Sequence, residues 1–193
     1  DKLDTWRQPL ADLLASLGSV KTRVLRLQYG GAVGQLDKLG DNKAEISARL
    51  ALELGLANQG CWHTSRGPLG ECVNWLSQLS GALGKMGQDV ALMAQNEVGE
   101  IKLSGSGGSS AMPHKQNPVS AEVLVTLARF NSTLLSGMHA SLVHENERSG
   151  SAWTLEWMLL PQMVMASAAG LRSASLLLGN MNQIGIAEDS NAQ

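Results

Sequence analysis

"PLGECVNWLSQLSGALGKMGQDVALMAQNEVGEI", residues 68–101, carries apolar side chains at helical spacing over more than thirty residues. Pro68 suits the first turn of a helix, where its missing N–H has no partner to lose. At ~1.5 Å per residue such a helix approaches ~50 Å, and a helix of that length normally lies in a bundle or an oligomer interface. The apolar positions are Leu69, Val73, Leu76, Leu79, Leu83, Met86, Val90, Met93 and Ile101.

The residues on both sides of this stretch predict further helices. Residues 6–27 repeat apolar side chains at alternating steps of four and three, and residues 43–56 form a shorter helix that Asp41 or Asn42 could cap. Another long helix opens at Pro118 and runs to Leu142; a last one follows "HENERSGS", with Pro161 marking a kink or a new start. Runs of β-branched and aromatic residues are missing. We therefore expect an all-α bundle of long helices, several of which pack against other copies of the chain.

Composition excludes several classes of function. The 193 residues are 44% hydrophobic and 17% charged, with a net charge of −2, which suits a globular protein without an electrostatic footprint for nucleic acid or an anionic membrane. The longest uncharged run falls short of the ~20 apolar residues of a membrane span. Cys61 and Cys72 fit neither a disulfide framework nor a paired zinc motif, which predicts reduced, buried thiols in a cytoplasmic protein.

A glycine- and serine-rich loop, "LSGSGGSSAMPHKQN", separates two of the predicted helices. Its first half has the composition of a flexible linker. Lys115 lacks the flanking residues of a Walker loop, and the third glycine of a dinucleotide fingerprint is missing where Ser110 stands. In its second half an ammonium at Lys115, an amide at Asn117 and the free N–H groups of a helix start form a site for a carboxylate, over which the glycines could fold.

The stretch "GSSAMPHKQNP", residues 108–118, resembles the signature loop of the fumarase/aspartase superfamily. The resemblance extends from "GGAVG" at residues 30–34 to "NERSGSAWTLEWMLLPQM" at residues 146–163. It implies a homotetramer on a core of long helices, with each active site made by three subunits. "WHTSR" at residues 62–66 and the tryptophans after Arg148 are similar to the cycloisomerase branch and unlike the nucleotide-binding lyases.

The resemblance implies a role for each candidate residue. An intramolecular lactonisation of a tricarboxylate would use Ser109 to move the proton alpha to a carboxylate, with Lys115 and Asn117 facing the developing charge. Glu122 matches a carboxylate that pairs with a histidine of another subunit; a solvated surface glutamate is the alternative. The expected catalytic residues are Ser109, Lys115 and Glu122, and the expected substrate-binding residues are Ser110, Met112, Asn117, Arg148, Arg66 and His114. For Arg66 an ordinary surface ion pair is equally open.

The resemblance also bounds the expectation. Asn146 stands where the family's triplet usually begins with histidine. Residues 1–185 correspond to the central helical domain and residues 186–193 to the start of a linker toward a C-terminal domain, with the N-terminal segment lying before residue 1. No metal or organic cofactor is expected. Adenylosuccinate lyase or another lyase of the superfamily, and a helical scaffold without catalysis, remain alternatives.

Overall fold

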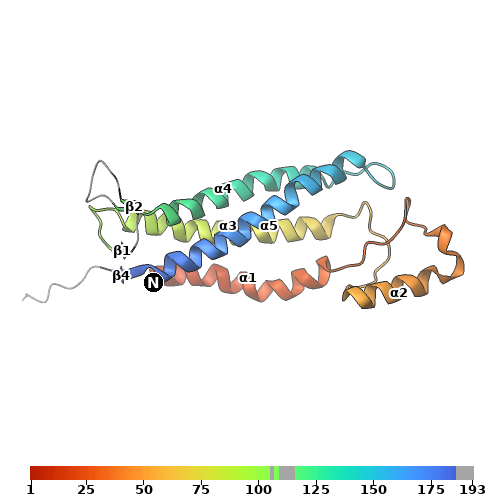
Figure 1. Cartoon of the computed structure of the whole chain (residues 1–193), viewed down its shortest axis with the longest axis horizontal. Helices are drawn as coiled ribbons and strands as arrows, with labels where there is room; N and C mark the ends of the chain where they lie inside the picture. Colours follow the sequence, from red (N-terminus) through yellow and green to blue (C-terminus); the bar gives the residue numbers. More distant parts are fainter. Residues whose placement is uncertain (105–106, 109–115, 186–193) are drawn as a thin grey trace, which may run out of the picture.

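The structure is a computed structural model that describes residues 1–104, 107–108 and 116–185. Four long helices run beside one another along most of the molecule (Figure 1). The expected all-α bundle is confirmed, with two short antiparallel strand pairs added, β1 with β4 and β2 with β3. In chain order the elements are α1 (Lys2–Val24), the 3-10 helix η1 (Asp37–Asn42), α2 (Lys43–Leu54), α3 (Gly67–Met93), β1 (Ile101–Leu103), β2 (Gly107–Gly108), β3 (Gln116–Asn117), α4 (Val119–Ala140), α5 (Gly150–Gly179) and β4 (Met181–Ile184).

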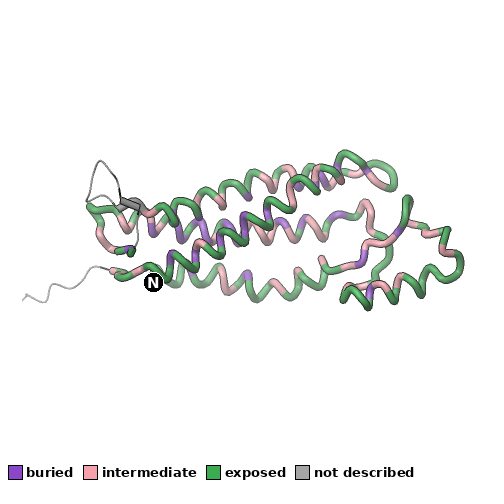
Figure 2. The backbone as a smooth tube through the Cα atoms, in the orientation of Figure 1, coloured by how far each residue is buried: buried purple, intermediate pink, exposed green. Residues whose placement is uncertain are grey.

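Helix α3 is the centre of the bundle because it packs against α1, α4 and α5. Its buried residues recur along its whole length, as Figure 2 shows. Small residues bring α3 close to α4: a Cβ added at Gly84 would stand 2.5 Å from the Cβ of Ala128, and one at Gly87 would stand 2.5 Å from the carbonyl oxygen of Ala121. The two backbones could not approach this closely with larger side chains.

The predicted length of α3 is wrong at its C-terminal end. The helix stops at Met93, so its 27 residues span about 40 Å instead of ~50 Å. Gly99 adopts a positive φ of 63°, which turns the chain, and Ile101 then pairs with Ile184 in the antiparallel ladder of β1 and β4. Helical spacing alone could not separate a buried strand residue from the end of a helix.

Other boundaries differ by smaller amounts. The first helix ends at Val24 rather than Leu27, and α4 ends at Ala140 rather than Leu142. Asn42 occupies the N-cap position of α2, but its side chain makes no capping hydrogen bond. Helix α5 runs through Pro161 without a new start.

The two cysteines differ in exposure. Cys61 is exposed, which corrects the prediction that both thiols are buried. Burial of Cys72 raises the pKa of its thiol.

A polar group lies inside the apolar core where three helices meet. The Nδ2 of fully buried Asn131, on α4, donates to the Oγ of Ser80 on α3 at 2.6 Å and to the Oγ of Ser167 on α5 at 3.0 Å. Buried polar groups are costly unless they are paired, so these contacts favour one register of the three helices over others.

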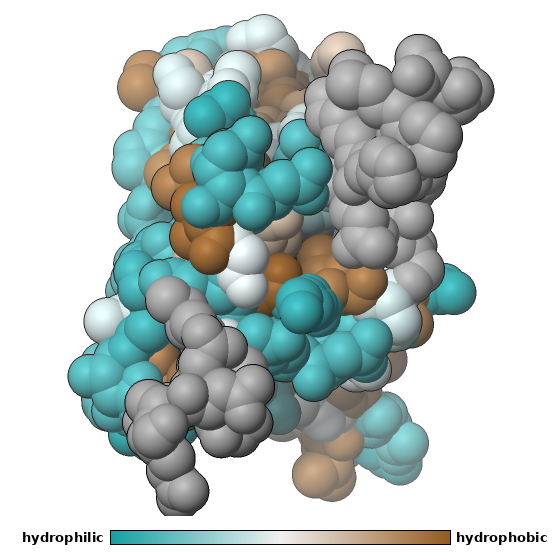
Figure 3. Space-filling model, turned by 90° about the vertical axis from the view of Figure 1, so that its left-hand side faces the viewer, coloured by the Kyte–Doolittle hydropathy of each residue, from teal (hydrophilic) through white to brown (hydrophobic). Residues whose placement is uncertain are grey.

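The two ends of the bundle are formed by different elements. At one end, seen face-on in Figure 3, hydrophilic side chains surround smaller apolar areas, and β1 contributes Ile101 and Leu103 to the core that also holds Trp6 and Leu177. At the other end α3 begins, α4 ends and α5 begins (Figure 1). Within the described ranges, no helix combines the length and the apolar character needed to cross a bilayer.

Candidate functional site

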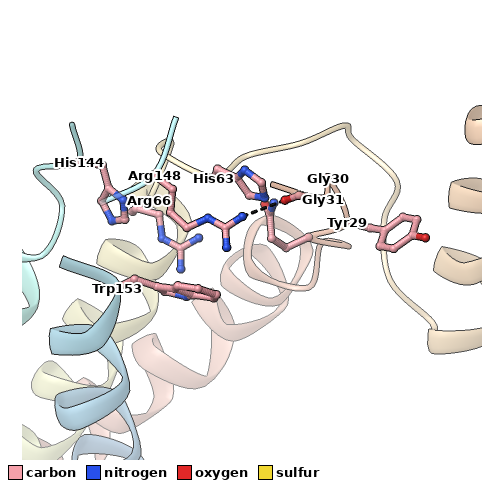
Figure 4. A pocket seen from close by; sticks show the side chains of 9 residues that line it. Tyr29, Gly30, Gly31, His63, Arg66, His144, Arg148 and Trp153 are labelled. Carbon is pink, nitrogen blue, oxygen red and sulfur yellow. Dashed lines mark hydrogen bonds between the residues drawn. The ribbon is translucent and has the colours of Figure 1, made fainter. Parts of the chain in front are cut away.

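A cavity of about 320 Å³ lies where these three helix ends meet the segment that follows α1. Figure 4 shows side chains from different elements converging on it. Among the described residues, its lining contains two arginines and two histidines but no Asp or Glu. The lining residues are Gln28, Tyr29, Gly30, Gly31, His63, Arg66, His144, Arg148 and Trp153.

The segment after α1 is held against the segment before α3 by hydrogen bonds. The backbone N–H of Trp62 donates to the Oε1 of Gln28 at 2.9 Å, and the indole N–H of Trp62 donates to the carbonyl of Leu27 at 3.1 Å. Gly30 has no room for a side chain, since a Cβ there would lie 2.6 Å from the Sγ of Cys61. The glycines therefore form a close-packed wall of the cavity.

Arg148 joins that wall to α5. Its Nη2 donates to the carbonyl of Gly31 at 2.8 Å and to the carbonyl of Ala32 at 3.1 Å. Its guanidinium carbon lies 4.6 Å from the ring centroid of Trp153, a cation–π contact. The cation is thus held at the cavity by backbone carbonyls on one side and an aromatic face on the other.

Arg66, at the N-terminus of α3, is held by a carboxylate of α5. Its Nε donates to the Oε1 of Glu156 at 2.8 Å and its Nη2 donates to the Oε2 at 2.6 Å. Arg66 is 8% exposed and Glu156 is 2% exposed. Arg66 also lies over the ring of Trp62, with 4.6 Å between the guanidinium carbon and the ring centroid. The surface ion pair that the sequence left open as the alternative for Arg66 is wrong, because the pair is buried.

His63 is the lining residue whose charge responds most directly to the two arginines. Its Nδ1 is buried and has no hydrogen-bond partner among the described residues. Burial first, and then the positive charges of Arg148 and Arg66, lower the pKa of His63 from 6.5. The ring therefore favours its neutral form, and the cavity has its positive charge on the arginines. Such a cavity can bind an anion that accepts several hydrogen bonds.

His144 lies in the loop between α4 and α5. Its Nδ1 accepts a hydrogen bond from the backbone N–H of Ser149 at 3.2 Å, and its Nε2 lies 3.7 Å from the Oε1 of Glu156. Because Nδ1 is the acceptor, a neutral ring has its proton on Nε2, which faces the carboxylate. At 3.7 Å this contact is no hydrogen bond, and Nε2 has no hydrogen-bond partner among the described residues, so His144 lies between Glu156 and the loop that contains Arg148 but is bonded only to the loop.

A second cavity, of about 310 Å³, lies on the other side of the Arg66–Glu156 pair. Apart from that pair its lining is apolar or aromatic: Trp62, Leu69, Trp157, Leu160 and Pro161. Arg66 lines both cavities, whereas Glu156 lines only this second one. The Arg66–Glu156 ion pair therefore lies between the arginine-lined cavity and the apolar one.

The structure brings some of the predicted site residues together and keeps others apart. Arg66 and Arg148 line one cavity. Glu122 is exposed in the first turn of α4, at the opposite end of that helix, and the backbone of Asn117 pairs with Gly107 just before it. The remaining predicted residues, Ser109, Ser110, Met112, His114 and Lys115, lie outside the described residues.

Sequence reasoning missed Glu156 as a partner of Arg66, and it missed His144 and the wall at residues 28–31 as parts of the site. A signal for Glu156 was present: between Gly150 and Leu171 it is the single charged residue of an otherwise uncharged segment. A lone charge in an apolar helix needs an opposite charge nearby. The segment that would supply it could not be read from spacing, because Arg66 is 90 residues away. Within the described residues, no group of three metal-ligating side chains gathers.

Comparisons with known proteins agree with the fold. The lyase family model matches residues 1–130. The 3-carboxy-cis,cis-muconate cycloisomerase of Pseudomonas aeruginosa is 43% identical over 84% of the chain, and that of Acinetobacter baylyi is 38% identical over 92%. The chain spans only 36% and 41% of the lengths of these two relatives.

A solved structure is similar over nearly the whole chain. The 3-carboxy-cis,cis-muconate lactonizing enzyme from Pseudomonas putida superposes with a TM-score of 0.87 and 36% identity, over 94% of this chain and 40% of that one. The long helices and the sequence that builds them are therefore shared with an enzyme of known fold. On the family model and these relatives together, the chain belongs to the lyase family of the fumarase/aspartase superfamily.

Proposed function

We propose that the full-length protein is a 3-carboxy-cis,cis-muconate cycloisomerase of protocatechuate degradation, the activity named for the relatives at 43% and 38% identity. The observation that carries this proposal is the presence of Arg66, paired with Glu156 behind it, and of Arg148 in one cavity with no Asp or Glu among the described residues that line it. A tricarboxylate needs such a cavity, because a carboxylate removed from water must find cationic donors.

The reaction would be an intramolecular lactonisation. One carboxylate oxygen of the substrate forms a bond to a carbon of a C=C double bond, and a proton adds to the carbon alpha to another carboxylate. As free acids the substrate and the product, 4-carboxymuconolactone, are isomers. At neutral pH the substrate trianion takes up one proton, which solvent returns to the donor, and no other co-reactant is needed. Negative charge builds up on the carboxylate next to the protonated carbon, and fixed donors aimed at it would lower the barrier.

The proposed roles follow the signature loop and the cavity. Ser109 gives the alpha proton during lactonisation and removes it in reverse; Lys115 and Asn117 face the developing charge, and Glu122 pairs with a histidine of another copy. Arg66 and Arg148 each bind a carboxylate, which their planar guanidinium groups suit. Ser110, Met112 and His114 complete the substrate contacts.

We propose further that the active protein is a homotetramer in the cytoplasm whose sites are shared between copies. Its support is the distance within one chain: Glu122 and the arginine cavity belong to opposite ends of α4. Helix α5 also leaves Trp157, Met165 and Leu176 largely exposed, as expected of a face that packs against other copies. Residues 1–185 would form the central helical domain of each copy, and residues 186–193 would begin the linker.

The experiment is a pair of assays on the full-length protein. Loss of the diene absorbance of 3-carboxy-cis,cis-muconate, with the lactone identified by NMR, supports the proposal. Cleavage of adenylosuccinate without lactone formation overturns it in favour of another lyase, and no turnover of either overturns it in favour of a scaffold. A folded Ser109→Ala protein should lose turnover by roughly a hundredfold or more, as for loss of general acid catalysis. Ser132→Ala, at an exposed site on α4, is the matched control.

A further inference from the structure

Glu156 is a buried carboxylate beside the cavity that Arg66 and Arg148 line, but Glu156 does not line that cavity itself. Both of its oxygens accept hydrogen bonds from Arg66, at 2.8 and 2.6 Å. A buried ion pair is not in itself stabilising, because removing two charges from water costs about as much as their attraction returns. Stability alone therefore does not account for an ion pair at this place.

The pair fixes the orientation of the Arg66 guanidinium. Two parallel hydrogen bonds to Glu156 set the plane of that group, and the Trp62 ring, 4.6 Å away, covers one face of it. A guanidinium is rigid, so a fixed edge also fixes the directions of its other N–H groups. Arg66 thereby reaches the cavity in one orientation.

The same carboxylate lies close to His144, which contacts the loop of the second arginine. The Nε2 of His144 lies 3.7 Å from Glu156, and its Nδ1 accepts from the N–H of Ser149, the residue after Arg148. Glu156 thus binds Arg66 directly and lies near the imidazole that contacts the loop of Arg148, without a hydrogen bond to its Nε2. Glu145, another carboxylate of this loop, is exposed and interacts with Ser149 and His144. It makes no ion pair with Arg66.

We propose that Glu156 is a positioning residue that sets the spacing of the Arg66 and Arg148 guanidinium groups for a ligand with two carboxylates. The proposal rests on the proposed function in one respect, that this cavity binds the substrate. A ligand with one carboxylate engages one arginine and is indifferent to the spacing. A ligand with two carboxylates gains its second contact only when the spacing fits, because misplacement costs the preorganisation of the site.

The test measures binding of succinate and of acetate to the full-length protein, through the ring C–H NMR signals of His63, which lines the cavity. In Glu156→Gln the carboxylate charge is gone at almost unchanged volume. We expect the Kd for succinate to rise about tenfold or more and the Kd for acetate to change by less than about threefold. In turnover, the KM should rise more than the kcat falls. Glu71→Gln, which removes the exposed partner of Arg23, is the matched control and should change neither Kd.

A folded Glu156→Gln protein that binds succinate as the native protein does overturns the proposal, and so does an equal loss for both ligands, which is what a merely structural role produces. If Glu156→Gln fails to fold, Glu156→Asp replaces it, since that variant keeps the charge opposite Arg66 but withdraws it by one methylene. The selective loss for succinate is expected there too, and its absence overturns the proposal. Failure of the native protein to convert carboxymuconate, with succinate selectivity intact, overturns the proposed function and supports the role of Glu156.

Discussion

The side chain of Arg148 donates a hydrogen bond to the carbonyl of Gly31 at 2.8 Å, across 117 positions of sequence. The bond joins the start of α5 to the glycine segment that follows α1. Because the acceptors are backbone carbonyls, the guanidinium keeps its full charge beside the cavity. Arg148 is therefore a structural link, and under the proposed function it has a second purpose as a cation for a carboxylate.

Replacing Arg148 with lysine should separate these two purposes. Lysine keeps the charge but cannot span two carbonyls and stack on Trp153 with one planar group. We expect the KM of the full-length protein for its carboxylate substrate to rise roughly tenfold, the scale of one charged hydrogen bond. Hydrogen exchange at the amides of residues 30–34 should also become faster. Arg7→Lys, at an exposed pair with Asp4, should alter neither quantity; unchanged exchange in Arg148→Lys would contradict the linking role.

The close approach of α3 and α4 predicts opposite effects of one substitution at two glycines of the same helix. Gly87→Ala should lower the free energy of unfolding by about 1–3 kcal/mol, because its Cβ would meet the Ala121 carbonyl oxygen at 2.5 Å and the Leu124 Cβ at 2.8 Å. Gly81→Ala should raise it by about 0.4–1 kcal/mol, since a Cβ there has open space and alanine favours the helix. Urea denaturation measures both. Equal effects of the two changes would refute the close packing.

The lowered pKa of His63 predicts a loss of stability in mild acid. Burial and the nearby Arg148 and Arg66 charges lower the pKa in the folded state, so below pH 6.5 the unfolded chain binds a proton that the folded chain does not. The stabilisation is complete above this pH and is lost as the pH falls toward the folded pKa. As the pH falls below 6.5, the free energy of unfolding should therefore decline less steeply in His63→Gln than in the native protein. His139→Gln, at an exposed site, should keep the native slope.

The helical periodicity predicted the bundle because a long apolar stripe on a helix is normally buried against other helices. It located the start of α3 at Pro68 to within one residue, since proline restricts the backbone locally. It failed at the end of α3, where Ile101 continues the apolar spacing but is buried in a strand pair. Non-local pairing with Ile184 decides that boundary, and no local signal reports it.

The candidate site was predicted only in part, again because contacts between distant parts of the sequence form it. Arg66 and Arg148 were identified from short motifs around them, but their meeting in one cavity depends on three helix ends and a loop. The alternative for Arg66, a surface ion pair, was wrong about burial because the partner, Glu156, belongs to another helix and could not be identified from nearby sequence. The principle that a buried charge must be paired predicts a partner for Glu156 but does not identify that partner.

The separation of Glu122 from the arginine cavity has a thermodynamic consequence. From Glu122 to Ala140 helix α4 rises by about 27 Å, too far for the two groups of residues to interact directly in one chain. Substitutions at Glu122 and Arg148 should then be additive in unfolding free energy to within about 0.5 kcal/mol. A double-mutant cycle that measures turnover tests a different contact. Non-additive effects on turnover are expected if the Glu122 end of one copy and the Arg148 end of another meet around one substrate. Because α4 keeps Glu122 and Arg148 apart within one chain, coupling between them in turnover would report a contact between chains.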